Sequence, residues 1–253
     1  HSIRIEMKAV YQTAIEKYEE YGKLLNPADL LVWTIDHFGI DKVVMGTGFG
    51  VPGVVLLDIL KKVNKNVEVF YIDTGVLFKE TYELKNQLES HYDMKFKRFS
   101  TQIPIEQQRE LYGDELWNRD PNLCCNIRKV MPLKKALSSY DVWITGIRKS
   151  QTELRKDSDA IEYDERYNVT KINPLINWTH EQVWDYIEEN KLPFNKLHKE
   201  GFPSLGCTHC TTSVKSGEDD RAGRWRGSGK TECGLHFNQQ NGQIRIVKPG
   251  DKN

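Results

Sequence analysis

The 253-residue sequence lacks both a long apolar run and a net charge. Its most apolar stretch, residues 51–60, is interrupted by Pro52 and Asp58, so no segment approaches the roughly 18–20 residues of a membrane helix. The 36 Lys and Arg residues balance 36 Asp and Glu residues, which argues against a general polyanion binder but permits a local basic site. Mean hydropathy is −0.61. These values indicate a globular protein of one large or two small domains, and no membrane partner is expected.

Cysteine is also scarce, and the five cysteines are too few and too unevenly placed for a disulfide scaffold. Cys124 and Cys125 are adjacent, Cys207 and Cys210 form a CxxC motif, and Cys233 stands alone. The first residues lack a starting Met and the apolar segment of a secretory signal. We therefore expect a cytoplasmic protein, in which clustered cysteines serve metal binding or catalysis more often than disulfides.

Apolar periodicity alternates between short strands and helices along most of the chain. Strands are expected at residues 42–46, 67–72, 94–99 and 140–146, and helices at 5–25, 26–38, 54–63, 77–90, 127–138 and from 180 onward. This alternation predicts an α/β fold with a parallel sheet. Ligands bind such sheets at the carboxyl ends of the strands, so the expected site loops are 46–51, 73–76 and 146–155.

Together, the four paired cysteines could hold one zinc ion or an iron–sulfur cluster. Neighbouring thiolates tend to point apart, which disfavours capture by one small ion and favours a cluster, whose irons lie at different corners. The alternatives are buried apolar roles for Cys124 and Cys125 and a redox pair of Cys207 and Cys210.

Cys233 lies in a segment with Lys230 and His236. Cations lower a thiol pKa, so Cys233 is a candidate nucleophile, or else an incidental surface thiol.

Three loops are candidates for binding an anionic ligand. Residues 45–50, MGTGFG, follow a strand and precede a helix, where backbone N–H groups can hold phosphate, although a tight turn explains them equally well. The second loop, residues 73–75, can contact a ribose or base, or simply cap a helix. In the third loop, residues 145–155, the arginines can bind oxyanions or face solvent. The candidates in the first two loops are Gly46, Thr47, Gly48 and Phe49, and Asp73, Thr74 and Gly75.

In combination, these motifs resemble one family, the assimilatory reductases of adenylyl sulfate (APS) and 3′-phosphoadenylyl sulfate (PAPS). The resemblance spans residues 28–236, and its most specific parts are the four paired cysteines and the sequence ECGLH. The matching segments are 45–50, 71–75 (YIDTG), 124–129 (CCNIRK), 145–151 (TGIRKSQ) with 173–179 (NPLINWT), and 201–210 (GFPSLGCTHC) with 230–236 (KTECGLH).

This resemblance implies an adenine nucleotide alpha hydrolase-like fold, related to the ATP pyrophosphatases, with a parallel twisted sheet flanked by helices. The SGGxDS loop of the ATP-cleaving relatives is missing here, which suits a protein that binds a nucleotide without hydrolysing ATP. We expect an N-terminal helical segment over 1–25, a nucleotide- and cluster-binding domain over 26–214, and a mobile tail over 215–253 that carries the catalytic cysteine.

The resemblance also implies the site residues. One 4Fe-4S cluster would be held by Cys124, Cys125, Cys207 and Cys210, and the phosphosulfate would be surrounded by Arg148, Arg221, Arg224 and His236. Lys129 would reach both cluster and substrate. Val76 stands where the family often has Arg, which removes one expected phosphate or ribose contact.

The implied activity is reduction of APS to sulfite and AMP through an S-sulfo intermediate on Cys233, which thioredoxin or a similar dithiol resolves. Members with four cluster cysteines generally use APS, members without them use PAPS, and some accept both, so PAPS or dual specificity is the alternative. An ATP pyrophosphatase that thiolates tRNA is a second alternative, but it should retain SGGxDS. A zinc-stapled nucleic-acid-binding module is a third. For the reductase no nucleic-acid partner is expected, and the sequence is compatible with a homo-oligomer.

Overall fold

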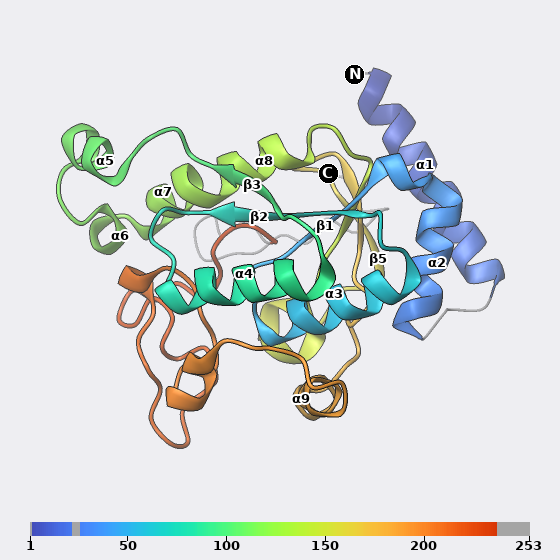
Figure 1. Cartoon of the computed structure of the whole chain (residues 1–253). Helices are drawn as coiled ribbons and strands as arrows, with labels where there is room; N and C mark the ends of the chain where they lie inside the picture. The colour runs from blue at the N-terminus through green and yellow to red at the C-terminus, as the bar shows by residue number, and fades with distance from the viewer. Residues whose placement is uncertain (1, 22–25, 237–253) are drawn as a thin grey trace.

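The computed structural model describes residues 2–21 and 26–236, and in that part of the chain six strands form one sheet in the order β3-β2-β1-β4-β6-β5 (Figure 1). Five strands run parallel, and β5 pairs with β6 in antiparallel orientation. The strands are β1 (Val43–Gly46), β2 (Glu68–Asp73), β3 (Lys97–Ser100), β4 (Val142–Ile144), β5 (Ile161–Asp164) and β6 (Val169–Ile172). The four strands expected from the sequence are confirmed, and the β5–β6 pair was not predicted.

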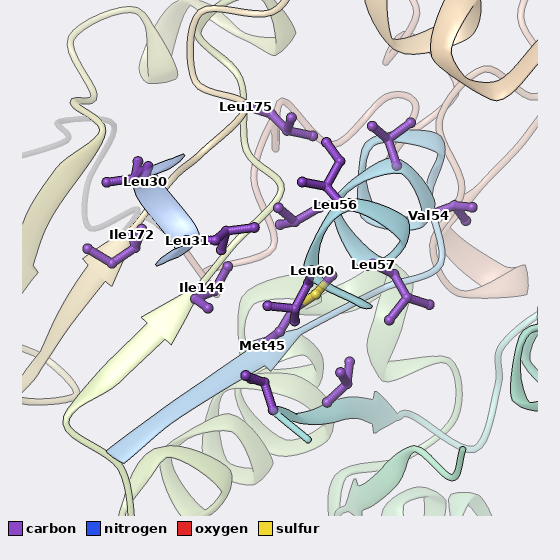
Figure 2. Packing of buried hydrophobic residues seen from close by; sticks show 14 of the residues in the cluster. Leu30, Leu31, Met45, Val54, Leu56, Leu57, Leu60, Ile144, Ile172 and Leu175 are labelled. Carbon is purple, nitrogen blue, oxygen red and sulfur yellow. The ribbon is translucent and has the colours of Figure 1, made fainter. Parts of the chain in front are cut away.

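Helices cover both faces of the sheet (Figure 1). Strand residues alternate between two cores: Met45 and Ile144 face α2, α3 and α9, whereas Val44 and Trp143 face α8. Figure 2 shows leucines of α2 and α3 packed over β1, β4 and β6 in the larger core. The helices are α1 (Ser2–Glu20), α2 (Pro27–Phe38), α3 (Val51–Val63), α4 (Lys79–Tyr92), α5 (Ile105–Tyr112), α6 (Leu116–Arg119), α7 (Pro121–Cys125), α8 (Met131–Leu137) and α9 (His180–Glu189). Burial of both faces is typical of a parallel sheet.

Local sequence signals explain where several helices begin. The Asn26 side chain accepts a hydrogen bond from the Ala28 N–H at 2.8 Å and caps α2. Helix α3 begins at Val51, three residues before the expected start, because Pro52 is compatible with the first turn of a helix. The expected helix over 127–138 is divided into a π turn (Asn126–Val130) and α8. Pro132 has no N–H to donate to the carbonyl of Arg128, so a regular α-helical ladder cannot run through this point.

The two ends of the described chain pack against the sheet domain. Tyr11 of α1 lies with its ring centroid 5.6 Å from that of Tyr163 in β5, and Tyr11 and Tyr18 join the larger core. Residues 215–236 contain turns and no helix or strand, and yet Trp225 and Glu232 are only 5% and 1% exposed. This portion of the expected tail is therefore held against the domain, and residues 237–253 lie outside the described part. The three-part division itself stays a prediction. None of the described helices has the length and apolar character needed to cross a bilayer.

Replacing Gly46 with alanine is expected to lower the free energy of unfolding by about 1–3 kcal/mol. A Cβ at this position would lie 2.7 Å from the Trp143 Nε1 and 2.9 Å from Cζ of Phe70. Both rings are buried and cannot move away without disturbing the core under α8. Urea denaturation measures the change. The matched control is Gly48→Ala, where an added Cβ meets no atom within 4 Å; equal losses in the two variants would contradict this steric explanation.

Candidate active site

Four of the five cysteines line one cavity that lies beyond the carboxyl end of β2. Their two segments come from distant parts of the sequence, α7 and residues 207–210. Figure 1 shows α5, α6 and α7 together with the orange and red C-terminal segment on the side toward which β2 points. The lining residues are Val76, Ile105, Trp117, Cys124, Cys125, Arg128, Lys129, Cys207, His209 and Cys210.

Backbone contacts join the loop after β2 to the CxxC segment. Cys207 forms an isolated antiparallel bridge with Leu77, and the Thr208 N–H donates to the carbonyl of Val76 at 2.9 Å. The Cys207 thiol donates to the Thr74 hydroxyl at 3.3 Å. Val76 thus lies in the cavity wall and holds the CxxC segment through its backbone carbonyl.

The adjacent cysteines end the short helix α7. Asp120 caps this helix by accepting from the Leu123 N–H at 2.9 Å, and Pro121 occupies its first turn. Cys124 and Cys125 are 8% and 5% exposed. Burial raises the pKa of both thiols, and for Cys124 the neighbouring Cys125 adds to that rise. These thiols are therefore protonated at neutral pH unless a bound cation stabilises their thiolates.

Cys210 completes the set from the more open side of the cavity. Burial and the nearby Cys207 raise the pKa of Cys210 to about 12. Among the described residues, no three His, Cys, Asp or Glu side chains are arranged to hold a single metal ion. A zinc ion needs four ligands, with sulfurs at about 2.3 Å, whereas each thiolate of an iron–sulfur cluster binds a different iron. The four cysteines that line this cavity are a donor set that fits an iron–sulfur cluster, and the cluster itself stays a prediction.

Lys129 is a buried cation in the π turn that directly follows the adjacent cysteines. It is 6% exposed, and its Nζ lies 5.8 Å from the ring centroid of Trp225. Burial lowers the Lys129 pKa, but the thiol groups of Cys207, Cys125 and Cys233 outweigh this effect, so the net shift is upward. Lys129 is therefore an ammonium group facing sulfur atoms contributed by three separate segments.

Cys233 lies close to Lys129. Burial raises the Cys233 pKa, but the charge of Lys129, a backbone hydrogen bond from Leu235 and the charge of Arg224 together outweigh it, so the net shift is downward. The next residue, Gly234, has φ of 86°, and a Cβ there would lie 3.3 Å from Cγ2 of Val130. A side chain at 234 would be strained and crowded, so glycine permits this close approach. Cys233 thus differs from the cysteines of the cavity in having an environment that favours the thiolate.

The residues flanking Cys233 are fixed by two arginines, of which Arg155 is buried and Arg166 is half-buried. Arg155 binds both carboxylate oxygens of Glu232, through Nε and NH2, each at 2.9 Å. Arg166 donates to the carbonyls of Gly234 at 2.9 Å and Leu235 at 3.0 Å. The segment is held on both sides of the thiol. The sequence reasoning noted Arg155 only as a candidate oxyanion ligand and missed Glu232, although ECGLH contains it.

His236 lies away from the cysteine cavity in a different environment. Its ring stacks on that of Trp143 with centroids 4.9 Å apart and planes 7° from parallel. Burial lowers the His236 pKa well below its usual value, and Lys171 lowers it further. The ring is therefore neutral at pH 7, and its predicted role toward the phosphosulfate stays a prediction.

Among the described residues, four arginines each keep a buried Nε atom without a hydrogen-bond partner. Arg148 and Arg224 are 6% and 9% exposed. Arg148 donates to Ser150 Oγ at 2.9 Å, whereas Arg224 donates to Ser204 Oγ and the Leu205 carbonyl, both at 3.1 Å. Buried donors normally have a partner, so these Nε atoms are available to an acceptor such as an anion or water. The four are Arg128, Arg148, Arg221 and Arg224.

Arg128 was not singled out from the sequence, although it lies within CCNIRK. It is 3% exposed, and it donates to the carbonyls of Thr74 at 2.7 Å and Ile103 at 3.2 Å. The bond to Thr74 joins the π turn that follows the adjacent cysteines to the loop after β2. Arg128 therefore helps to set the position of this loop.

Both carboxylate oxygens of Asp73 accept hydrogen bonds from other groups of the protein. Its carboxylate accepts hydrogen bonds from the Gly75 N–H at 2.9 Å, Tyr82 at 2.6 Å and Arg98 at 2.7 Å. Burial raises the Asp73 pKa, but the bonds from Tyr82 and Arg98 outweigh it and keep the carboxylate ionised. Gly75 adopts φ of 75° in this turn. In this arrangement Asp73 orders the loop, and any contact with a ribose or base stays a prediction.

The loop after β1 presents backbone rather than side chains. The Thr47 hydroxyl accepts from the Phe49 N–H at 3.1 Å. Phe49 is 3% exposed, and its ring packs against those of Tyr71 and Phe96. Phe49 is thus a core residue whose side chain is not open to a ligand, and Gly48 remains the open position of the loop.

Comparisons with known proteins agree with this geometry. Residues 42–213 match the phosphoadenosine phosphosulfate reductase domain. The chain is 42% identical over 236 residues to the adenosine 5′-phosphosulfate reductase of Halalkalibacterium halodurans, a match that covers 93% of this chain and 98% of that protein. A solved phosphoadenylyl-sulfate reductase from Candida auris, in complex with phosphate, is 30% identical with a TM-score of 0.67, covering 82% of this chain and 96% of that one.

A more distant structure supports the fold alone. The FMN adenylyltransferase of Candida glabrata is 16% identical and has a TM-score of 0.55, with 84% of this chain and 68% of that chain covered. Together with the parallel sheet, these neighbours confirm the α/β, adenine nucleotide alpha hydrolase-like fold expected from the sequence. A domain match over more than half of the chain, and a relative that aligns along nearly all of it, show that the chain belongs to the phosphoadenosine phosphosulfate reductase family.

Proposed function

We propose that the chain reduces adenylyl sulfate to sulfite and AMP, with Cys233 as the nucleophile. As a member of its family, the chain is an oxidoreductase that acts on a sulfur group. The observation that carries the proposal is the position of Cys233, beside the buried Lys129 and next to the cavity that four other cysteines line. A thiol whose pKa is lowered by a neighbouring cation is suited to nucleophilic attack.

Three arginines and Lys129 are proposed to bind the phosphosulfate group of the substrate. Arg148, Arg221 and Arg224 keep buried Nε donors without partners in the described structure, and Lys129 adds an ammonium group. Attack by a thiolate on a phosphosulfate brings two anions together, so the barrier is high unless nearby cations neutralise both. We assign these four residues to the phosphosulfate, and the backbone of residues 46–49 and 73–75 to the rest of the nucleotide. His236 and the Asp73 side chain are secondary candidates.

In the proposed reaction, Cys233 first takes up the sulfo group, and a dithiol then releases it as sulfite. The Cys233 thiolate attacks the sulfur of the sulfuryl group, an S–S bond forms, the bond from sulfur to the phosphate oxygen breaks, and AMP leaves. The product is S-sulfocysteine at position 233. A thioredoxin-like dithiol then attacks the Cys233 sulfur and displaces sulfite, and its second thiol releases the Cys233 thiolate. The dithiol is oxidised to a disulfide and supplies the two electrons that reduce the sulfur.

Cys124, Cys125, Cys207 and Cys210 would hold a 4Fe-4S cluster. All four line one cavity, and the raised pKa values of Cys124, Cys125 and Cys210 leave thiols that a bound metal group would convert to thiolates. When bound, such a cluster would supply a charged, polarisable group beside Lys129. Lys129 itself would orient the sulfuryl oxygens and favour the thiolate form of Cys233. The dithiol donor needs a reducing compartment, so we propose a cytoplasmic location.

Adenylyl sulfate is the proposed substrate rather than its 3′-phosphorylated form. The support is the identity of 42% to a protein named adenosine 5′-phosphosulfate reductase, compared with 30% to a phosphoadenylyl-sulfate reductase. Comparing kcat/KM for the two nucleotides tests this choice. A higher value for the 3′-phosphorylated form would reverse it, and equal values would indicate dual specificity.

The central test uses protein purified anaerobically and mixed with adenylyl sulfate without reductant. Mass spectrometry of the peptide containing Cys233 should show the added mass of one sulfo group, and thioredoxin should then release sulfite. Protein first alkylated at Cys233 is the control, and it should form no adduct. An unmodified Cys233 peptide after complete mixing would overturn the proposal.

Replacing Lys129 with methionine is expected to slow S-sulfo formation by roughly 100-fold, the scale of losing one stabilising donor. Because Lys129 lowers the Cys233 pKa, its loss should also move the pH midpoint of Cys233 alkylation upward, so that less thiolate is present at pH 7. Alkylation rates measured across pH check this direction. The matched control is Lys134→Met on the exposed side of α8, which should leave both rate and midpoint unchanged. An unchanged midpoint in the Lys129 variant would contradict the assignment.

A further inference from the structure

We propose that Glu232 is a positioning residue whose buried carboxylate, held by Arg155, sets the place of the Cys233 sulfur for attack. The inference rests on the proposed function and adds a role that the reaction scheme does not itself require. Glu232 immediately precedes the nucleophile and is 1% exposed. A charged side chain is seldom so deeply buried unless it is paired, and its binding partners then define its position.

The contacts of Glu232 are numerous and directional. Arg155 binds its two oxygens in a bidentate arrangement, with Nε to Oε1 and NH2 to Oε2 both at 2.9 Å. Thr152 donates its hydroxyl to Oε1 at 3.2 Å, and the NH2 of Arg221 lies 3.6 Å from Oε2. Such a planar fork fixes orientation as well as distance. The backbone at 232 is therefore held firmly, and so is the start of residue 233.

The same contacts link the nucleophile to a proposed substrate-binding loop. Arg155 donates through NH1 to the side-chain oxygen of Gln151, and that oxygen also accepts from the Arg148 N–H at 2.9 Å. Arg148 is one of the arginines with an unpartnered buried Nε. Gln151 and Arg155 thus place Arg148 and Glu232 relative to each other. This connection aligns the sulfur of Cys233 with the group that Arg148 would bind.

The effect of the Glu232 charge on the Cys233 thiol does not explain why a carboxylate occupies position 232. The Glu232 charge raises the Cys233 pKa, so it opposes the lowering by Lys129 and reduces the fraction of reactive thiolate. If Glu232 acted only through its charge, a neutral replacement would speed attack. If it acts by position, the same replacement slows attack, because small misplacements of a reacting atom are costly. The two explanations predict opposite signs.

The experiment compares Glu232→Gln with wild type in the first half-reaction. Anaerobically purified protein is mixed with adenylyl sulfate without reductant, and the growth of the S-sulfo Cys233 peptide is timed. We expect the rate to fall by about 100-fold, while the affinity for AMP changes by less than about twofold, since Glu232 contacts protein groups. The matched control is Glu218→Gln, which removes an exposed pair of similar geometry, with Arg226 at 2.9 Å from both oxygens, and should keep the wild-type rate.

A second variant covers the case in which Glu232→Gln does not fold, as judged by iron content and thermal melting. Glu232→Asp keeps the charge but shortens the side chain by one methylene, so it should slow S-sulfo formation and retain AMP binding. An S-sulfo rate equal to or above that of wild type in either folded variant would overturn the positioning role. Failure of the proposed function is a separate result, since wild-type protein would then form no S-sulfo peptide.

Discussion

Replacing Cys233 with serine is expected to abolish sulfite formation, with a loss of roughly 10⁶-fold, the scale of removing a catalytic nucleophile. A serine hydroxyl is scarcely ionised near neutral pH and cannot form the S–S bond that the dithiol donor later attacks. Lys129 would then face an uncharged group where the structure places a thiol with a lowered pKa. Sulfite release and the mass of the peptide containing residue 233 are the measurements.

Other properties of the Cys233→Ser protein should be retained. Its iron content should match that of wild type, because Cys233 is absent from the lining of the cavity that the other four cysteines share. AMP affinity should change little, since the arginines proposed to bind the phosphosulfate are untouched. Ser228→Ala, an exposed change in the same segment, is the control and should keep activity. Near-normal turnover by Cys233→Ser would remove the nucleophile role.

Replacing Cys207 with serine is expected to eliminate bound iron and the broad visible absorption that gives iron–sulfur proteins their brown colour. Serine is a harder donor than thiolate and is poorly suited to iron–sulfur ligation. Cys207 is fixed by its bridge to Leu77 and its bond to Thr74, so no other cysteine can readily take its place. Iron analysis and visible spectra of anaerobically purified protein measure the loss.

Thr208→Ser supplies the control for this substitution. Thr208 is the adjacent residue, its side chain is exposed, and its N–H bond to Val76 does not depend on the side chain. This variant should retain iron and colour. Full iron content in Cys207→Ser would exclude Cys207 from the ligand set. Wild-type protein that holds no iron after anaerobic purification would exclude the cluster as a whole.

Much of the fold could be predicted because it depends on local periodicity. Apolar patterns near Val43, Val69 and Val142 identified strands that the structure confirms, and the capping box at Thr179 and Gln182 begins α9 as expected. The β5–β6 pair was missed, because charged and polar residues interrupt both strands, IEYD and VTKI, which are stabilised by pairing in the sheet. The π turn was missed because its i→i+5 hydrogen bonding leaves no clear periodic signal.

The sequence was sufficient to predict which residues form much of the candidate site, but only part of how they are arranged. The cysteine motifs and ECGLH identified the residues from which a site is built. Their spacing did not show that Asp73 is engaged by its neighbours, that Phe49 is a core residue, or that His236 stacks on Trp143. These outcomes depend on which groups meet across the sheet, a property of packing rather than of sequence spacing.

By itself, the sequence determined the chemical inventory: five cysteines in a distinctive pattern, an α/β order of elements, and loops at the strand ends where a ligand binds. Only the tertiary structure decided that α7, residues 207–210 and Cys233 converge on Lys129, and that Arg155 holds the residue before the nucleophile. The physical reason is that a thiol's reactivity depends on burial and on charges within a few ångströms. Those neighbours come from segments roughly 20 to 100 residues apart in the chain, and folding alone brings them together.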